Sequence, residues 1–105
     1  MIYNLFISRA AVHDIEQAVA WYEKQRRGLG YELELCIEAG LTSLQREPLI
    51  YQKKKKKDVR VKYIKRFPYC IHYEIESTSI KVVALFHMKQ DPIKWDGRLN
   101  KDDLG

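Results

Sequence analysis

The side chains in this sequence that are best suited to chemistry are basic and aromatic, and most of them lie in the second half of the chain. Five consecutive lysines, Lys53–Lys57, precede Arg60 and Lys62, which are two residues apart. Cations of this kind hold phosphates or carboxylates, and a histidine can exchange a proton near neutral pH. The candidate residues for binding a target or a partner are Lys53, Lys54, Lys55, Lys56, Lys57, Arg60, Lys62, Arg66, His87, Lys89, Trp95 and Arg98.

The charge is unevenly distributed along the chain. The net charge is +5, but residues 1–50 carry −2 and residues 51–105 carry +7. A basic half favours an anionic partner, either nucleic acid or an acidic protein segment. A surface that is merely rich in lysine explains the charge equally well.

The lysine run and the next basic pair have different expected surroundings. Because five like charges repel one another, we expect residues 51–58 to form a loop, which is either a solvated connector or a phosphate-contacting loop. In the strand that follows, Arg60 and Lys62 share one face, which we expect to be the solvent face.

Several classes of site are missing from the sequence. It has no glycine-rich phosphate loop, no zinc-ligand spacing and no nucleophile elbow, so we expect neither a metal nor a cofactor. The two cysteines, Cys36 and Cys70, are expected to be free thiols in a reducing compartment. With no signal peptide or transmembrane segment visible, the expected location is the cytoplasm, with no membrane partner.

The elements that must position these residues are organised around a hairpin at residues 66–87. Tyr69 to Glu76 alternates apolar and polar side chains, Ser77–Ser79 is a polar turn, and Ile80 to Phe86 is apolar on both faces. In this second strand the predicted faces are Ile80, Val82, Ala84 and Phe86 on one side, and Val83 and Leu85 on the other.

Two helices and two further strands complete the prediction. We expect a strand at residues 3–8 with Ser8 as helix N-cap, helices at 10–25 and 29–46, and a strand at 59–64. Gly28 and Gly30 break the helices apart, and Pro48 ends the second one.

This order predicts an α+β fold, β-α-α-β-β-β, with a two-helix hairpin packed on one face of a mainly antiparallel sheet. The other face is expected to be open or half covered. A single domain should span residues 1–98, with a short helical turn after Pro92 and a frayed tail at 99–105.

Short motifs across nearly the whole chain resemble RelE/ParE-type toxins of bacterial type II toxin–antitoxin modules. They are Ala18-x-x-Trp21-Tyr22-Glu23, Gly28-Leu29-Gly30, Arg66-Phe67-Pro68-Tyr69-x-Ile71-x-Tyr73, Ile80-x-Val82-x-Ala84-x-x-His87 and Pro92-x-x-Trp95-x-x-Arg98. The resemblance implies a small toxin that is neutralised by a cognate antitoxin with an acidic, partly disordered segment. It also implies the strand-helix-helix-strands order that the periodicity predicts.

The resemblance implies one of two mechanisms. RelE-like toxins cleave mRNA on the ribosome without metal, using basic and aromatic side chains, whereas ParE-like toxins act on DNA gyrase. RelE-like sequences place an arginine three residues before the central tyrosine, and here that position is Cys70, before Tyr73. A second arginine corresponds to Lys89, and the C-terminal tyrosine corresponds to Trp95.

These departures place the chain nearer the ParE branch, as a toxin that arrests growth by binding and inhibiting DNA gyrase. The first alternative is a ribosome-dependent mRNA endonuclease that uses His87, Lys89, Arg60 and Lys62. A further alternative is a non-toxic, nucleic-acid-binding relic of such a toxin. For His87, a ring hydrogen-bonded at the end of its strand is as good an interpretation as an acid or base.

Overall fold

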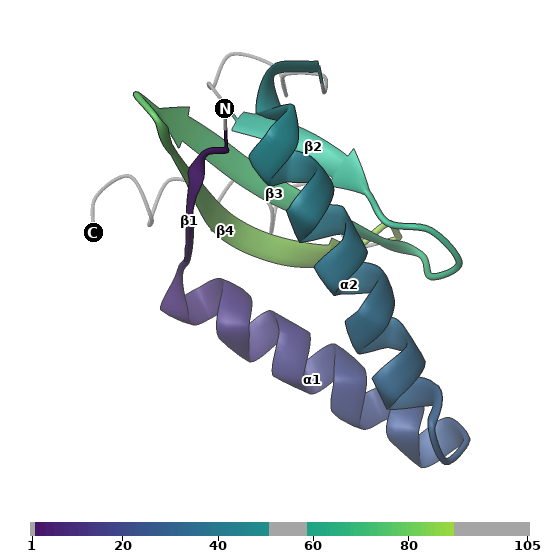
Figure 1. Cartoon of the computed structure of the whole chain (residues 1–105). Coiled ribbons are helices and arrows are strands. Elements are labelled where there is room, and N and C mark those ends of the chain that lie inside the picture. The colour runs from purple at the N-terminus through teal and green to yellow at the C-terminus, as the bar shows by residue number, and fades with distance from the viewer. Residues whose placement is uncertain (1, 51–58, 90–105) are drawn as a thin grey trace.

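A computed structural model describes residues 2–50 and 59–89 of the chain (Figure 1). In chain order the elements are β1 (Asn4–Ile7), α1 (Arg9–Gln25), α2 (Leu29–Arg46), a short 3₁₀ turn (Pro48–Ile50), β2 (Val59–Tyr63), β3 (Tyr69–Glu76) and β4 (Ser79–His87). The predicted α+β order is therefore confirmed. The single domain at 1–98 stays a prediction, because the described residues end at 89.

The four strands form one mixed sheet in the order β1-β4-β3-β2. β1 runs parallel to β4, and the β2–β3 and β3–β4 pairs are antiparallel. The two helices form an antiparallel hairpin over one face of this sheet, with α1 beside β4 and α2 crossing above β3 and β2 (Figure 1). The hairpin and its face are as predicted.

The start of α1 is fixed by Ser8, as the sequence indicates. The Ser8 Oγ accepts a hydrogen bond from the Ala11 amide at 3.1 Å and donates one to the Val83 carbonyl at 3.3 Å. The same hydroxyl therefore satisfies a free amide in the first helical turn and ties the helix to β4. Ala11 and Ala18 are the buried residues of α1, and their small size lets the helix lie close to the sheet.

The link between the helices depends on two glycines and one carboxylate. Gly28 has a φ of +90°, in the left-handed region that favours glycine. The Glu23 carboxylate accepts hydrogen bonds from the amides of Gly28 (2.9 Å) and Gly30 (3.0 Å), which supplies an anionic cap at the start of α2. At Gly30 a Cβ would lie 2.7 Å from the Val19 carbonyl oxygen, so the two helices can approach this closely only over a glycine.

The larger core lies between the helices and the sheet, with Tyr73 at its centre. This side chain is fully buried, and its hydroxyl donates to the Pro48 carbonyl at 2.7 Å. This hydrogen bond joins the 3₁₀ turn that follows α2 to β3. The buried members of this core are Ala11, Ala18, Leu33, Ile37, Leu44, Ile64, Phe67, Ile71, Tyr73, Ile80, Val82 and Leu85.

The predicted faces of β4 are wrong because this strand contains a β-bulge. His72 pairs with Ala84 and the adjacent Tyr73 pairs with Val82, which leaves Val83 as an extra residue. One inserted residue reverses the alternation beyond it. As a result Ile80, Val82 and Leu85 face the helices, while Val83, Ala84 and Phe86 belong to a second buried cluster.

The second face of the sheet is buried, contrary to the prediction that it is open or half covered. Cys70 and His72 are both 0% exposed there, and Phe86 is 3% exposed. The buried apolar cluster on this face comprises Val59, Val61, Cys70, Val83, Ala84 and Phe86. The described strands therefore do not present the open concave surface that the sequence suggested.

Candidate functional site

Two hollows in the surface flank the helical layer. The first is a groove of about 510 Å³ along α2, bounded on its other side by β2 and the turn that follows. We call it the α2/β2 groove. Its lining residues are Glu32, Leu35, Cys36, Ala39, Gly40, Ser43, Lys62, Tyr63, Ile64, Lys65 and Arg66.

The walls of the α2/β2 groove are largely apolar and accessible. Leu35 is 46% exposed, although it is a large hydrophobic side chain. At Gly40 a Cβ would lie only 3.2 Å from Ile71 Cδ1 and 3.3 Å from Ile64 Cγ2. The glycine therefore lets α2 sit low on the sheet and leaves its outer side as a wall of the groove.

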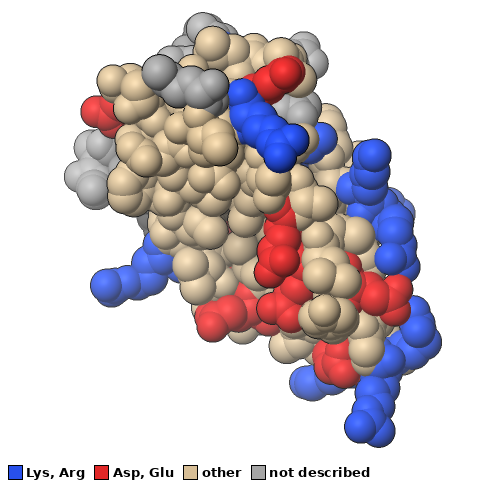
Figure 2. Space-filling view, viewed as in Figure 1, with Lys and Arg blue, Asp and Glu red and all other residues tan. Residues whose placement is uncertain are grey.

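Arg66 forms the charged end of the groove. Its guanidinium lies 2.6 Å from the Glu32 carboxylate, which also contacts Arg26 at 3.2 Å. The hydrogen bond from Arg66 lowers the pKa of Glu32, and the same bond raises the pKa of Arg66. Figure 2 shows acidic side chains over α2, with basic ones at the margin of the molecule on the side of β2.

The backbone at Arg66 is also unusual. Its φ is +73°, in the left-handed region that only glycine adopts without steric cost. The guanidinium carbon lies 5.4 Å from the centre of the Phe67 ring, within range of a cation–π interaction. The turn between β2 and β3 therefore holds this cation in one place.

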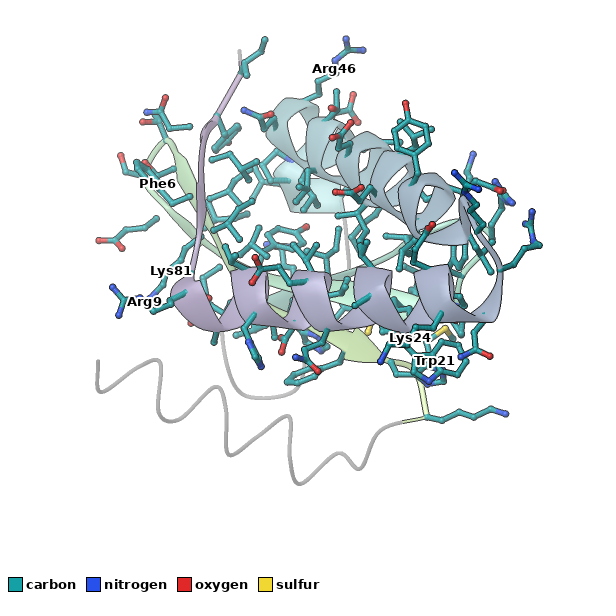
Figure 3. All side chains as sticks on the ribbon, turned by 90° about the horizontal axis from the view of Figure 1, so that it is seen from below. Phe6, Arg9, Trp21, Lys24, Arg46 and Lys81 are labelled. Carbon is teal, nitrogen blue, oxygen red and sulfur yellow. The ribbon has the colours of Figure 1, made fainter. Side chains whose placement is uncertain are left out.

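The second hollow, of about 360 Å³, lies between α1 and the ends of β3 and β4; we call it the α1 hollow. An Asp14 carboxylate oxygen accepts a hydrogen bond from the Leu85 amide at 3.1 Å. The exposed Trp21 lies beside Lys24 towards the end of α1 (Figure 3). The residues that line the α1 hollow are Asp14, Gln17, Ala18, Trp21, Tyr69, Leu85 and His87.

His87 is held at the end of β4 by a local hydrogen bond. Its Nδ1 accepts from the Lys89 amide at 3.1 Å, so the neutral ring carries its proton on Nε2. The ring packs edge-to-face on Tyr69 with centroids 5.1 Å apart. Burial, and then the nearby Tyr22, raise the pKa of Tyr69, so this phenol stays protonated at neutral pH.

Aromatic rings continue from the α1 hollow into the core. Tyr22 makes edge-to-face contacts with Trp21 (4.8 Å), Phe67 (5.1 Å) and Tyr69 (6.1 Å). Such contacts are favourable beyond the area that they bury. The ring of Tyr22 therefore acts as packing between α1 and the β2–β3 turn.

The predicted pair Arg60 and Lys62 does share a face, but that face is the helix side rather than the solvent side. The alternate residues Val59 and Val61 belong to the buried cluster of the second face, which turns the basic pair towards α2. Arg60 Nη1 donates to the Leu49 carbonyl at 3.1 Å, and Lys62 lines the α2/β2 groove.

The four residues proposed for an RNase are not brought together. The α2/β2 groove contains Lys62 and the α1 hollow contains His87, and the two hollows share no lining residue. Lys89 follows His87 at the end of β4 and is exposed. Cys70, at the position of the RelE-like arginine, is fully buried, and its Sγ lies 3.6 Å from the Phe86 carbonyl oxygen.

Sequence reasoning missed most of the α2/β2 groove. Tyr31 and Leu35, four residues apart on the outer side of α2, are exposed at 63% and 46%. An apolar pair on an otherwise acidic helix face was a visible signal for a binding surface. Of the predicted site residues, Lys53–Lys57, Trp95 and Arg98 lie outside the described residues, as does the turn expected after Pro92.

Some kinds of site are missing from the described part of the chain. Within residues 2–50 and 59–89 there is no group of three or more His, Cys, Asp or Glu side chains able to hold a metal ion. In the same ranges no helix combines the length and apolar character needed to span a membrane. Cys36 and Cys70 are not joined in a disulfide.

Comparison with known proteins finds similarity to a toxin family and to solved structures. A family described as "ParE toxin of type II toxin-antitoxin system, parDE" matches residues 5–92. The solved structure of a chain from the "Chromosomal ParDE TA system from P. aeruginosa" is similar, with a TM-score of 0.75 and 14% sequence identity, over 84% of this chain and 98% of that chain. A comparison with curated proteins found no match.

Proposed function

The chain belongs to the ParE toxin family of type II toxin–antitoxin systems, and on that basis we propose that it arrests growth by binding and inhibiting DNA gyrase. Membership of such a family also implies a cognate antitoxin. The gyrase target comes from the family resemblance, and the geometry of the described residues supports it over RNA cleavage.

The main observation that favours gyrase binding over RNA cleavage is the burial of Cys70. Metal-free RNA cleavage needs a base for the 2′-hydroxyl, a cation at the phosphorane and an acid for the leaving oxygen, all at one point. At Cys70, where RelE-like toxins place an arginine, there is a thiol that is fully buried in the second face. His87 and Lys62 line separate hollows, so they cannot supply the missing charge together.

We assign the contacts with gyrase to basic and aromatic residues of the second half of the chain. Lys53–Lys57, Trp95 and Arg98 are the candidates, with Lys89 beside them in sequence. An inhibitor that acts by binding needs complementary charge and shape but no acid or base. A basic half with +7 net charge complements an acidic surface of the partner or the DNA that the partner holds.

The test is a pair of assays on the purified chain. We expect it to inhibit supercoiling by gyrase, and we expect no cutting of mRNA on translating ribosomes. Changing Lys53–Lys57 to serine should weaken inhibition without altering the midpoint of thermal unfolding, because a run of like charges that repel one another adds little to stability. Arg9→Ser serves as a control for removal of a cation elsewhere on the surface.

Two results would overturn the proposal. Transcripts cut on the ribosome, with the cutting lost in His87→Ala, would identify the endonuclease alternative. Normal growth of cells that contain the soluble, folded chain and no antitoxin would identify a non-toxic relic.

A further inference from the structure

The outer edge of β1 has no strand beside it within the described residues. β1 pairs with β4 on one side, and the sheet order places no described strand on the other. The Ser8 amide donates to the Val82 carbonyl of β4 at 2.9 Å. Because successive residues of a strand turn their backbone groups to opposite sides, the N–H and C=O groups of Leu5 and Ile7 point away from β4.

The open part of this edge is short. Tyr3 also turns its backbone groups to the outer side, but there they meet the end of α2. The Tyr3 amide donates to the Gln45 carbonyl at 3.0 Å, and the Gln45 side-chain amide donates to the Tyr3 carbonyl at 3.1 Å. The open part is therefore limited to the backbone groups of Leu5 and Ile7.

The side chains of this edge are apolar and uncharged. Residues 2–8 contain no charged residue, no proline and no glycine. Phe6 is 59% exposed and Ile7 is 36% exposed, although both are large apolar side chains. Edge strands of soluble proteins are usually protected against pairing by charged residues or proline. β2, at the other edge, carries Arg60 and Lys62, so β1 is the edge that lacks this protection.

A second copy of the same strand is the partner that this edge fits. In an antiparallel pair centred on Phe6, Leu5 of one copy lies opposite Ile7 of the other. Both residues have outward backbone groups, so all of these groups become paired. The two Phe6 side chains then face each other at a non-hydrogen-bonded position, where cross-strand side chains are closest. A nucleic acid or an acidic segment would find no cation within residues 2–8.

The charges around this edge do not oppose the pairing. In this register Arg9 lies opposite Tyr3 of the other copy rather than opposite its own counterpart. Lys81 is in register with Phe6, and both line a surface hollow that Glu76 also lines. The two Lys81 residues would be three strand spacings apart, roughly 14 Å. That separation exceeds the distance over which exposed charges interact at physiological salt.

We propose that two copies of this chain form a symmetric dimer by antiparallel pairing of their β1 strands about Phe6. The two four-stranded sheets become one continuous sheet, with both helical hairpins on the same face. A twofold axis relates the copies, so the pairing stops at a dimer and leaves a β2 strand at each end. The dimer covers an apolar edge that is otherwise exposed. This inference does not rest on gyrase being the target or on an antitoxin.

The dimer is expected to be weak. Specific, stable interfaces bury about 800 Å² on each partner. A pair of strands this short covers less than that, and its affinity comes from a few backbone hydrogen bonds and one aromatic pair. We expect a Kd for dimerisation on the order of 10–100 μM.

The first experiment measures self-association of the purified chain by sedimentation velocity at a series of concentrations. Phe6→Lys places two ammonium groups against each other at the twofold axis, so we expect the Kd to rise by at least about tenfold. Tyr31→Lys is the matched control, because Tyr31 is an exposed aromatic residue near the start of α2. We expect dimerisation of this control to be unchanged.

The second experiment tests the backbone pairing. Ile7→Pro deletes an outward amide, which an edge strand tolerates, whereas Ile7→Ala shortens the side chain and keeps the amide. Since each dimer loses the bond twice, we expect Ile7→Pro to raise the Kd by about tenfold more than Ile7→Ala does. In the unchanged chain, hydrogen exchange at the Leu5 and Ile7 amides should slow as the concentration rises. This measurement keeps the test decisive even if the proline variant does not fold.

A cysteine substitution tests the register. Facing residues at a non-hydrogen-bonded position have Cα atoms about 4.5 Å apart, which a disulfide can span. In a Cys36→Ser background, Phe6→Cys should therefore form a disulfide between two copies under mild oxidation. Tyr31→Cys in the same background should not, and Cys70 is fully buried.

Several results would overturn the proposal. One is a chain that stays monomeric at concentrations well above the expected Kd. Another is a dimer that Phe6→Lys does not weaken, or in which exchange at the Leu5 and Ile7 amides is unchanged, because the contact would then lie elsewhere. A series of ever larger species in place of a dimer would show that the edge aggregates. None of these results bears on the proposed gyrase target.

Discussion

The α2/β2 groove and the α1 hollow lie on either side of the same helical hairpin, yet their side chains are used differently. In the α1 hollow the polar groups are occupied within the fold: Asp14 accepts from the Leu85 amide, and His87 accepts from the Lys89 amide. In the α2/β2 groove the large apolar side chain of Leu35 remains exposed, and within the described residues no strand pairs with the outer side of β2. His87, the best candidate for an acid or base, therefore lies in the α1 hollow, where the polar groups are hydrogen-bonded within the fold.

A side chain that could take part in catalysis is not always accessible to a substrate or partner, and the two hollows show this difference. A histidine whose ring nitrogen accepts a hydrogen bond at a strand end is used within the fold, whereas an exposed leucine is available for recognition. Variants in the α1 hollow should therefore change the free energy of unfolding, and variants in the groove should change binding. Changes at Gly30, Asp14, His87 and Glu32 test that division.

The largest effect is expected at Gly30, which both sites depend on because it sets the approach of α2 to α1. In Gly30→Ala the new methyl group would meet the Val19 carbonyl oxygen at 2.7 Å, and a backbone atom cannot move aside easily. We expect a loss of roughly 1–3 kcal/mol in the free energy of unfolding, measured by urea denaturation. Gly28 has open space around it but a φ of +90°, so Gly28→Asn, which tolerates that conformation, is the milder control.

The next effect is at Asp14. Asp14→Ala leaves the Leu85 amide without this acceptor, which should lower the free energy of unfolding by roughly 1–2 kcal/mol. Gln17→Ala, in the same hollow but exposed, should change stability by less than about 0.5 kcal/mol. If both variants lowered the free energy of unfolding equally, the Asp14–Leu85 hydrogen bond would make no specific contribution to stability.

His87→Ala should have a smaller effect. It removes the edge-to-face contact with Tyr69, worth about 0.5–1.5 kcal/mol, and leaves growth arrest intact. The measurement pairs thermal unfolding with a growth assay after induction. Lost toxicity in a variant of normal stability would give the α1 hollow a functional role and remove the contrast with the groove.

The smallest effect is at Glu32 and depends on pH. The Arg66 hydrogen bond lowers the pKa of Glu32 below its ordinary value of 4.5, so the carboxylate stabilises the fold above that pH. This contribution is lost as the pH falls through the lowered pKa. Because the pair is exposed to solvent, the expected change in unfolding free energy is slight.

NMR titration of the Glu32 carboxyl measures this directly. We expect a midpoint below 4.5 that moves back towards 4.5 in Arg66→Gly. The Glu32→Gln variant should unfold with a weaker dependence on pH between 5 and 3 than the unchanged chain. An unshifted midpoint would show that the ion pair does not persist in solution.

Local patterns were sufficient for the elements themselves. The bounds of α2 were predicted to the residue, Ser8 caps α1 as expected, and the period-two alternation of Tyr69 to Glu76 gave the correct faces of β3. These features depend on neighbours within a few residues along the chain, which the sequence displays directly. The motifs spread along the chain also predicted the toxin family that the comparisons show.

Local patterns could not predict which side chains of β4 lie on which face of the sheet, or on which face the basic residues lie. The bulge at Val83 depends on how β4 pairs with β3, and an unbroken apolar run carries no signal for the shift. Arg60 and Lys62 were assigned to solvent because their face is polar, yet the alternate face is the buried second cluster. When both faces of a sheet are covered, a basic side chain of one of its strands can lie on either face.

The order of the elements, the caps and turns between them, and the family of the chain can all be inferred from the amino-acid sequence. Tertiary structure decided which candidate side chains are available. Cys70 is buried, His87 accepts a hydrogen bond at the end of its strand, and Leu35 and Tyr63 are exposed. The physical reason is that helices and turns are fixed by short-range sterics and hydrogen bonding, whereas burial and strand pairing depend on residues far apart in the chain.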